Sequence, residues 1–372
     1  MIYLDNAATT RPIGEAGAAA EKFNKDAFFN PSALYKGGVE NRNFLNTARE
    51  NVLKYFPSGY EAIFTSGGTE ADNLAVFSFG TRGNFVTTAG EHSAVYESFL
   101  ELKRRGAEVR FAPLNKDGGV NISALTELID ENTSFVSVVH VNNETGAIND
   151  ISKIARTVKS KNPRAVFHSD GVQAFGKLNT KSGFSADLYS ISAHKIGGIK
   201  GVGALVKKKG VAVKPLIFGG GQEFTLRSGT ENIYGINVFS EALKINSGKI
   251  EENYEKVAKI KRDFALRLNA EDMRIISGEN SSPYVLSVSA EGLRGEVIQH
   301  MMEDFGVIIG TGSACSSKSR HSRILKECGY SNGTLDGALR ISFAGNTSYD
   351  EAMFAADKLN RCVAALKGVM KK

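Results

Sequence analysis

The stretch that decides the fold is Asp187-Leu-Tyr-Ser-Ile-Ser-Ala-His194-Lys195-Ile-Gly-Gly-Ile-Lys-Gly-Val-Gly203. Its apolar first half predicts a buried strand, and its glycines predict a turn directly after His194 and Lys195. Burying a lysine is costly, so a lysine at such a strand end, facing a cleft, indicates an amine kept for imine chemistry. The alternative interpretation is a solvated surface lysine that follows a strand.

A second apolar strand ends 25 residues before Lys195, in Phe167-His-Ser-Asp170-Gly-Val-Gln173. The carboxylate of Asp170 can pair with a protonated pyridine nitrogen, and Lys195 can form a Schiff base. These two groups are the minimum equipment for binding pyridoxal phosphate as a cofactor. Alternatively, Asp170 is an unrelated helix-capping aspartate.

Apolar strand-like runs alternate with helical patterns over the first two-thirds of the chain. The expected strands are 62–65, 84–88, 108–111, 134–141, 165–169, 187–192 and 202–206. The expected helices between them are 69–80, 92–105, 123–130 and 151–160. This alternation predicts an α/β fold with a mostly parallel sheet flanked by helices. Ligands bind beyond the carboxyl ends of such strands, where the candidate residues lie: Gly67, His92, Asn143, Asp170 and Lys195.

The last third of the chain has a different pattern. A helical stretch at about 230–268 leads to expected strands at 285–289 and 339–343, and to helices near 295–304 and 348–367. We therefore expect a large domain of residues 13–250. A smaller α+β domain would contain residues 1–12 and 251–372, including a polar loop at 311–321.

The motif Thr65-Ser-Gly67-Gly68-Thr69-Glu70 follows a strand and opens a helix. Backbone amides at a helix N-terminus bind phosphate, and glycine lets the ligand approach closely. Ser192 and His194 can supply further donors to the same phosphate. The alternative is an ordinary helix cap made by Ser66 or Thr69.

Three further polar residues follow or occupy apolar strands. The imidazole of His92 can stack on an aromatic cofactor and move protons. Asn143, in His140-Val-Asn-Asn-Glu144, can hydrogen-bond a phenolic oxygen or a carboxylate, and Arg340 can hold a carboxylate bidentately. The plainer alternatives are a packed histidine, turn chemistry for the asparagine, and a surface arginine on an edge strand.

Cys315 lies in Gly312-Ser-Ala-Cys315-Ser-Ser-Lys-Ser-Arg-His321, among glycine, serine and basic residues. Nearby cations favour the thiolate, so this setting indicates a reactive thiol. Cys328 and Cys362 lie in helical patterns and are expected to be structural.

Composition bounds the remaining possibilities. The chain has 372 residues, 42% of them hydrophobic, and a net charge of +6. It shows no apolar run of membrane-spanning length and no secretory leader, and its three cysteines fit neither a disulfide framework nor a zinc site. We therefore expect a cytoplasmic protein that neither spans a membrane nor binds a metal. The mild positive charge indicates a solvated surface rather than direct nucleic-acid binding, with an acidic partner or tRNA as alternatives.

Taken together, these segments resemble the NifS/IscS-type cysteine desulfurases, which are class-V aminotransferase-like enzymes of PLP fold type I. The likeness runs from Tyr3-Leu-Asp-Asn-Ala-Ala-Thr-Thr10 to the last strand and helix, so it covers nearly the whole chain. The motifs Ser192-Ala-His-Lys195, Arg227-Ser-Gly-Thr230 and Gly312-Ser-Ala-Cys315 are the most specific, together with those around Asp170 and Asn143. Tyr35 stands where the family often has histidine, and Ile199 where it often has proline, which leaves the subfamily and its partners open.

The resemblance implies a role for each residue. Lys195 is the Schiff-base lysine, Asp170 pairs with the pyridinium nitrogen, and His92 stacks on the ring and is counted as catalytic. Gln173, and alternatively Asn143, bonds the phenolic oxygen. The phosphate is held by Gly68, Thr69, Ser192 and His194, and by Thr230 of a second subunit. Asn143 and Arg340 bind the substrate carboxylate, and Cys315 receives the sulfur.

The resemblance also implies a homodimer that converts L-cysteine to L-alanine and leaves a persulfide on Cys315. The persulfide would pass to an acceptor protein, either an iron–sulfur scaffold or a tRNA-thiolation enzyme. The alternatives are a selenocysteine lyase, a cysteine sulfinate desulfinase, and an inactive homologue that acts as a scaffold. Retention of Lys195, Asp170 and Cys315 together argues against the scaffold.

Overall fold

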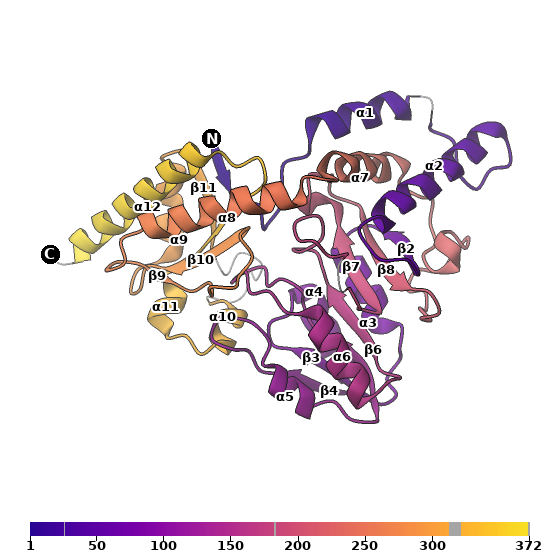
Figure 1. Cartoon of the computed structure of the whole chain (residues 1–372), viewed down its shortest axis with the longest axis horizontal. Helices are drawn as coiled ribbons and strands as arrows, with labels where there is room; N and C mark the ends of the chain where they lie inside the picture. The colour runs from indigo at the N-terminus through magenta and orange to yellow at the C-terminus, as the bar shows by residue number, and fades with distance from the viewer. Residues whose placement is uncertain (26, 182–183, 312–320, 371–372) are drawn as a thin grey trace.

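A computed structural model of the chain describes residues 1–25, 27–181, 184–311 and 321–370 (Figure 1). Cys315 lies outside the described residues. Within them the chain forms two β-sheets, each with its own helices and its own apolar core. The boundaries expected at residues 12/13 and 250/251 stay a prediction.

The larger sheet has seven strands in the order β2-β8-β7-β6-β5-β3-β4 within the described chain. Its central strands are parallel, whereas β8 runs antiparallel to both β2 and β7. The strands are β2 (Tyr60–Thr65), β3 (Asn84–Thr88), β4 (Glu108–Ala112), β5 (Thr133–Ser137), β6 (Val166–Asp170), β7 (Leu188–Ser192) and β8 (Gly203–Lys208). The α/β fold with a mostly parallel sheet is therefore confirmed.

Helices cover both faces of this sheet because side chains of opposite parity on each strand enter different cores. Leu188 packs on the side of α3 (Gly68–Phe77) and α4 (Ser93–Arg104), and Tyr189 packs on the other side. That second side is covered by α2 (Lys36–Leu53), α5 (Ile122–Glu127), α6 (Ile151–Lys161) and α7 (Ile233–Asn246). α1 (Gly14–Asn24) packs against α7. Burial on both faces is the reason these strands are nearly continuous apolar runs.

The smaller sheet joins the two ends of the chain. Its strand order is β1-β11-β12-β10-β9 in the described structure, with β1 parallel to β11. The strands are β1 (Ile2–Leu4), β9 (Arg274–Ile275), β10 (Val285–Ser289), β11 (Val307–Thr311) and β12 (Ala338–Ser342). The accompanying helices are α8 (Ile250–Arg267), α9 (Gly295–Glu303), α10 (Arg323–Glu327), α11 (Asn332–Asp336) and α12 (Tyr349–Met370) (Figure 1).

Two expectations about the elements were wrong. The helical stretch at 230–268 is two helices, because the chain turns at Ser247-Gly248 and Gly248 has a φ of +89°, which a helix does not allow. The strand expected at 134–141 ends at Ser137. Beyond it the chain enters a turn in which Asn142 Oδ1 accepts hydrogen bonds from the amides of Glu144 and Thr145.

Candidate active site

Lys195 lies one short turn beyond the end of β7, in the 3-10 helix Ala193–Lys195. Its Nζ donates to the carbonyl oxygens of Ala7 at 2.6 Å and Ala8 at 2.8 Å. Thr10 fastens the same N-terminal segment to this turn, because its hydroxyl donates to the carbonyl of His194 and accepts from the amide of Gly197. The N-terminal segment therefore forms one wall of the space around the lysine.

Asp170 ends the neighbouring strand β6 and is 4% exposed. Its Oδ1 accepts from the amide of Val172 at 2.9 Å. Burial raises the pKa of this carboxyl because it disfavours the anion, and the charges of His92 and Lys195 partly oppose that effect. A cationic ligand group beside Asp170 would restore the carboxylate.

His92 caps the N-terminus of α4, and its Nδ1 accepts from the amide of Ala94 at 3.2 Å. An accepting Nδ1 leaves the proton on Nε2. Burial lowers the pKa of His92, and the positive charge of Lys195 adds to this. The imidazole is therefore neutral near neutral pH.

The start of α3 lies directly against Ser192. A Cβ added to Gly68 would be 2.7 Å from Cγ2 of Val172 and 3.6 Å from Cβ of Ser192. The hydroxyl of Ser192 is buried without a hydrogen-bond partner among the described residues, and Thr69 is exposed in the first turn. The amides of that turn have no helical partner, so this corner presents donors to an anion.

Two other contacts complete this corner. Glu70 pairs with Arg227, with its Oε1 2.8 Å from Nε and its Oε2 3.2 Å from Nη2, so the loop around 227–230 is tied to α3. His194 Nδ1 lies 3.1 Å from the hydroxyl of Thr9, and burial with the charge of Lys195 lowers its pKa to about 4. Thr230 is exposed.

Arg340 reaches the same space from β12 of the smaller sheet and is 3% exposed. Its Nη1 donates to the carbonyl of Asn143 at 3.0 Å, and its Nη2 donates to Asp5 Oδ1 at 2.9 Å. Its Nε and the Oδ1 of Asn143 are buried without partners in the described structure. The pair expected to bind a carboxylate is thus in contact across 197 residues of sequence, with an unused donor.

Gln173 connects the N-terminal segment that forms one wall of the site to a second lysine, Lys177. Its Nε2 donates to the carbonyl of Ala7 at 2.8 Å, and its Oε1 accepts from Lys177 Nζ at 3.1 Å. The sequence reasoning missed Lys177. The spacing of four residues, about one helical turn after Gln173, was the signal that could have found it.

It also missed the contacts of Ser322 and Arg323, which follow the segment that contains Cys315. The hydroxyl of Ser322 donates to Glu144, and the guanidinium of Arg323 donates to the carbonyls of Ala89 and Glu91. These contacts connect the start of α10 to the turns that contain Asn143 and His92.

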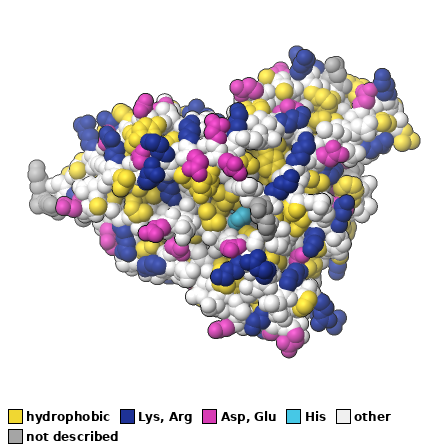
Figure 2. Space-filling view, viewed as in Figure 1, with side chains coloured by type: hydrophobic (Ala, Val, Ile, Leu, Met, Phe, Trp, Pro, Cys, Tyr) yellow, Lys and Arg dark blue, Asp and Glu magenta, His cyan; other side chains and the backbone are white. Residues whose placement is uncertain are grey.

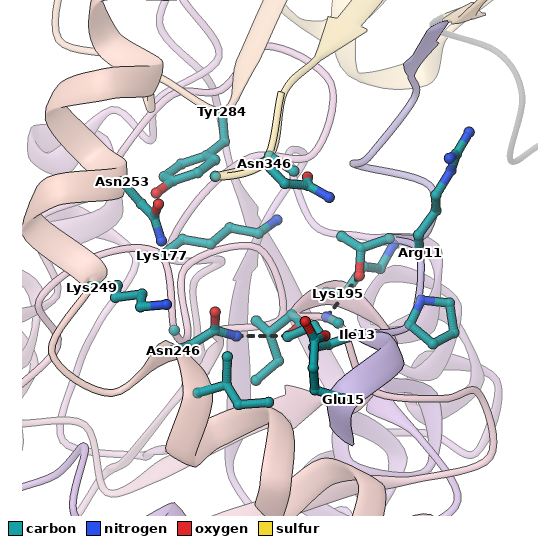
Figure 3. A pocket seen from close by; sticks show the side chains of 18 of the residues that line it. Arg11, Ile13, Glu15, Lys177, Lys195, Asn246, Lys249, Asn253, Tyr284 and Asn346 are labelled. Atoms are coloured by element: carbon teal, nitrogen blue, oxygen red, sulfur yellow. Dashed lines mark hydrogen bonds between the residues drawn. The ribbon is translucent and has the colours of Figure 1, made fainter. Parts of the chain in front are cut away.

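A cavity of about 500 Å³ opens beside Lys195 (Figure 3). It lies between the N-terminal segment, the α7–α8 junction and loops of the smaller sheet. The side chains of Arg11, Lys177, Lys195 and Tyr284 line it together with Asn346.

The chain matches the aminotransferase class-V family over residues 2–352. It is 34% identical to the cysteine desulfurase IscS of Dictyoglomus turgidum, over 99% of this chain and 96% of that protein. This chain is a NifS/IscS-type member of the class-V aminotransferase family. Another family member, the putative cysteine desulfurase IscS 1 of Bacillus subtilis, is 35% identical over 93% of this chain and 94% of its own length.

Solved structures agree with this assignment. A NifS-like protein superposes with a TM-score of 0.91 at 32% identity, over 98% of this chain and 99% of its own. A structure of SspA in complex with cysteine superposes with a TM-score of 0.80 at 26% identity, over 94% of this chain and 100% of its own.

Class-V aminotransferases use pyridoxal 5'-phosphate, and the residues present here fit that group. A buried carboxylate, Asp170, and an amine, Lys195, lie at the ends of adjacent strands. The partnerless hydroxyl of Ser192 beside the first turn of α3 suits a phosphate, and His92 supplies a flat neutral ring.

Proposed function

We propose that this protein is a cysteine desulfurase, which converts L-cysteine and the thiol of Cys315 into L-alanine and a persulfide on Cys315. The observation that carries the proposal is the convergence of Lys195, Asp170 and Arg340 from two sheets on one space. The names of its relatives and the cysteine complex of a structural neighbour support it.

The site residues take these proposed roles. Bound pyridoxal phosphate supplies an electron sink, which makes the Cα proton of the amino acid acidic. Lys195 accepts and returns that proton, and Asp170 keeps the opposite end of the site negative. His92 stacks on the ring. Its Nδ1 accepts the hydrogen bond that caps α4, so its Nε2 carries the proton.

Phosphate binding is proposed for the first turn of α3, with Gly68, Thr69, Ser192 and His194. Gln173 is proposed to donate to the phenolic oxygen, and Asn143 with Arg340 to bind the substrate carboxylate. The buried, partnerless Nε of Arg340 supports this role, because a carboxylate would satisfy it.

The sulfur step balances without an added oxidant. The Cβ–S bond of cysteine breaks, an S–S bond forms to Cys315, and protons complete alanine. The step removes one sulfur atom from the substrate and leaves it as the outer atom of the persulfide.

We also propose a homodimer, with Thr230 serving the phosphate site of the second copy. Exposed apolar side chains on two loops support it: Phe28, Leu34, Tyr35, Phe218 and Phe224. In the second loop Glu223, Phe224 and Thr225 all have positive φ, a strained arrangement for side-chain-bearing residues that occurs where function or an interface demands it.

The sulfur acceptor is proposed to be a protein, either an iron–sulfur scaffold or a tRNA-thiolation enzyme. Basic and acidic side chains are interspersed over the face in Figure 2, which favours a protein partner over nucleic acid. No helix among the described residues is long and apolar enough to cross a membrane. A cytoplasmic location stays a prediction.

The test is a paired assay of wild type and Cys315→Ala with L-cysteine and an added dithiol, which reduces the persulfide and releases its outer sulfur as sulfide; alanine, sulfide and cofactor absorbance are followed. The wild type should form alanine and sulfide, whereas the variant should bind cysteine, change its absorbance and stop. Equal turnover of both proteins would contradict the role of Cys315 and direct the next assay to selenocysteine or cysteine sulfinate. Absence of both cofactor absorbance and alanine in the wild type would contradict the proposal itself.

A further inference from the structure

Lys177 is a buried amine for which the proposed reaction has no role. It is 7% exposed, and its Nζ donates to Gln173 Oε1 at 3.1 Å. Figure 3 shows its side chain extending into the cavity that Lys195 also lines, with the ammonium end toward the open middle. Burying a lysine amine is costly, and the hydrogen bond to Gln173 offsets part of that cost.

Two partners fix the direction of the Gln173 amide. A lysine ammonium has donors and no acceptor, so the oxygen of the amide must face Lys177. The amide nitrogen then faces the carbonyl of Ala7, to which it donates at 2.8 Å. The same carbonyl accepts from Lys195 at 2.6 Å, so a continuous chain of hydrogen bonds runs from Lys177 to Lys195.

The surroundings of Lys177 set how strongly it is charged. Burial lowers its pKa to about 7, and the positive charges of Lys195 and Arg340 act in the same direction. The ring of Tyr284 lies 5.7 Å from its nitrogen, and Glu15 is an acidic group on the cavity wall. The charged and the neutral amine both have N–H donors for Gln173 Oε1, and the carbonyl of Ala7, which only accepts, keeps the amide nitrogen on its own side in either state.

We propose that Lys177 is a positioning residue, which holds the Gln173 amide with its N–H group toward the phenolic oxygen of the cofactor. Gln173 has two N–H donors, one of which serves Ala7. The second is then available to the cofactor. Without Lys177 only the carbonyl of Ala7 orients the amide, so the second N–H is held less firmly toward the phenolic oxygen. This inference rests on the proposed cofactor site.

The test compares Lys177→Met with Lys249→Met in the cofactor-loaded protein. Lys249 lines the same cavity and is exposed, and Gln173 is not among its recorded contacts, so it is a matched control. The readouts are the pH midpoint of the visible absorbance of bound cofactor, the cofactor Kd and the melting temperature. Lys177→Arg keeps a donor and tests rescue.

Lys177→Met should move the absorbance midpoint to higher pH by about one unit and weaken cofactor binding about tenfold. The two losses shift the midpoint in the same direction. Losing a nearby cation and losing an N–H donor to the phenolic oxygen each make the base formed by Lys195 and the cofactor easier to protonate. Lys249→Met should match wild type, and Lys177→Arg should recover most of the midpoint.

A comparison in a Gln173→Leu background separates positioning from a direct charge effect. If Lys177 acts through Gln173, adding Lys177→Met there should change the midpoint little. A full shift in that background, or no shift in Lys177→Met itself, would overturn the inference.

If Lys177→Met does not fold, Lys177→Leu takes its place with the same expectation. A wild-type protein without cofactor absorbance would instead be a failure of the proposed function, so the two failures are distinguishable.

Discussion

Gly68→Ala tests the phosphate corner directly. The new Cβ would lie 2.7 Å from Cγ2 of Val172, closer than real contacts of this kind, so the Val172 side chain, the start of α3 or the turn after Asp170 must move. The amide of Val172 donates to Asp170 Oδ1, so a shift of that turn would reach the carboxylate proposed to pair with the cofactor nitrogen.

The size of the effect follows from two opposed terms. Overpacking costs about 1–3 kcal/mol, whereas replacing glycine by alanine in a helix gains up to about 1 kcal/mol. The net loss of folding stability should therefore lie between about 0 and 3 kcal/mol, which leaves the protein folded. The gain in helix propensity acts on folding and not on cofactor binding, so the site has nothing to offset the overpacking of about 1–3 kcal/mol. We therefore expect the Kd for pyridoxal phosphate to rise about 5- to 150-fold.

The assay is a titration of cofactor-free protein with pyridoxal phosphate, followed by absorbance, with thermal melting of the same samples. Gly17→Ala in α1 is the control, because a Cβ there has no neighbour within 4 Å and affects only helix propensity. Gly68→Ala/Val172→Ala should recover much of the affinity by removing the clashing methyl group. Cofactor affinity in Gly68→Ala equal to that of wild type would refute the reasoning.

Three further predictions concern Arg340, which is proposed to bind the substrate carboxylate, the buried carboxyl of Glu144, and the apolar core of the smaller sheet. Arg340→Ala should raise KM for cysteine about 10- to 100-fold, because a charged hydrogen bond is lost, while cofactor absorbance stays; an unchanged KM would exclude Arg340 from substrate binding. Burial raises the pKa of Glu144 to about 7, so its carboxyl favours the folded state below pH 4.5, and this contribution is lost as pH rises through 7. Glu144→Gln should therefore melt higher relative to wild type at pH 8 than at pH 5, and a difference of the opposite sign would contradict the assignment. Phe264→Ala should destabilise the smaller sheet's core by about 3–5 kcal/mol in chemical denaturation, whereas a loss below about 1 kcal/mol would show that the site collapses around the deletion.

Local pattern was sufficient for most of the elements. The strand that ends at Ser192 and the strand that ends at Asp170 were expected within a residue of where they lie, because apolar residues recur along each, with Gly171 directly after Asp170 and Gly197 in the turn after Ser192. Local pattern failed where an element ended inside a continuing apolar pattern. Gly248 divides the helical stretch at 230–268, and Asn142 turns the chain after β5, although the surrounding periodicity continues.

The residues of the candidate site also differ in how far the sequence alone reveals them. Lys195, Asp170 and His92 could be found from sequence because each lies at a strand end or in the turn after one, and its residue type suits a chemical role. Lys177 had only its spacing of four residues from Gln173 as a signal, and Ser322 had none, because its importance comes from a contact rather than from a pattern. Ser322 donates to Glu144 across 178 residues, and no periodicity of 2 or 3.6 residues encodes such a separation.

The sequence by itself determined which side chains stand at strand ends, because burial on one or both faces of a sheet imposes a repeat that neighbouring residues must satisfy. Only the tertiary structure decided which of them meet. Arg340 reaches Asn143 and Asp5 because β1 pairs with β11 and β12 lies beside it, and the carbonyls of Ala7 and Ala8 meet Lys195 because the same N-terminal segment crosses from one sheet to the other. Contacts of this kind depend on how distant parts of the chain close on one another, and burial, hydrogen bonding and charge at the site follow from that closure.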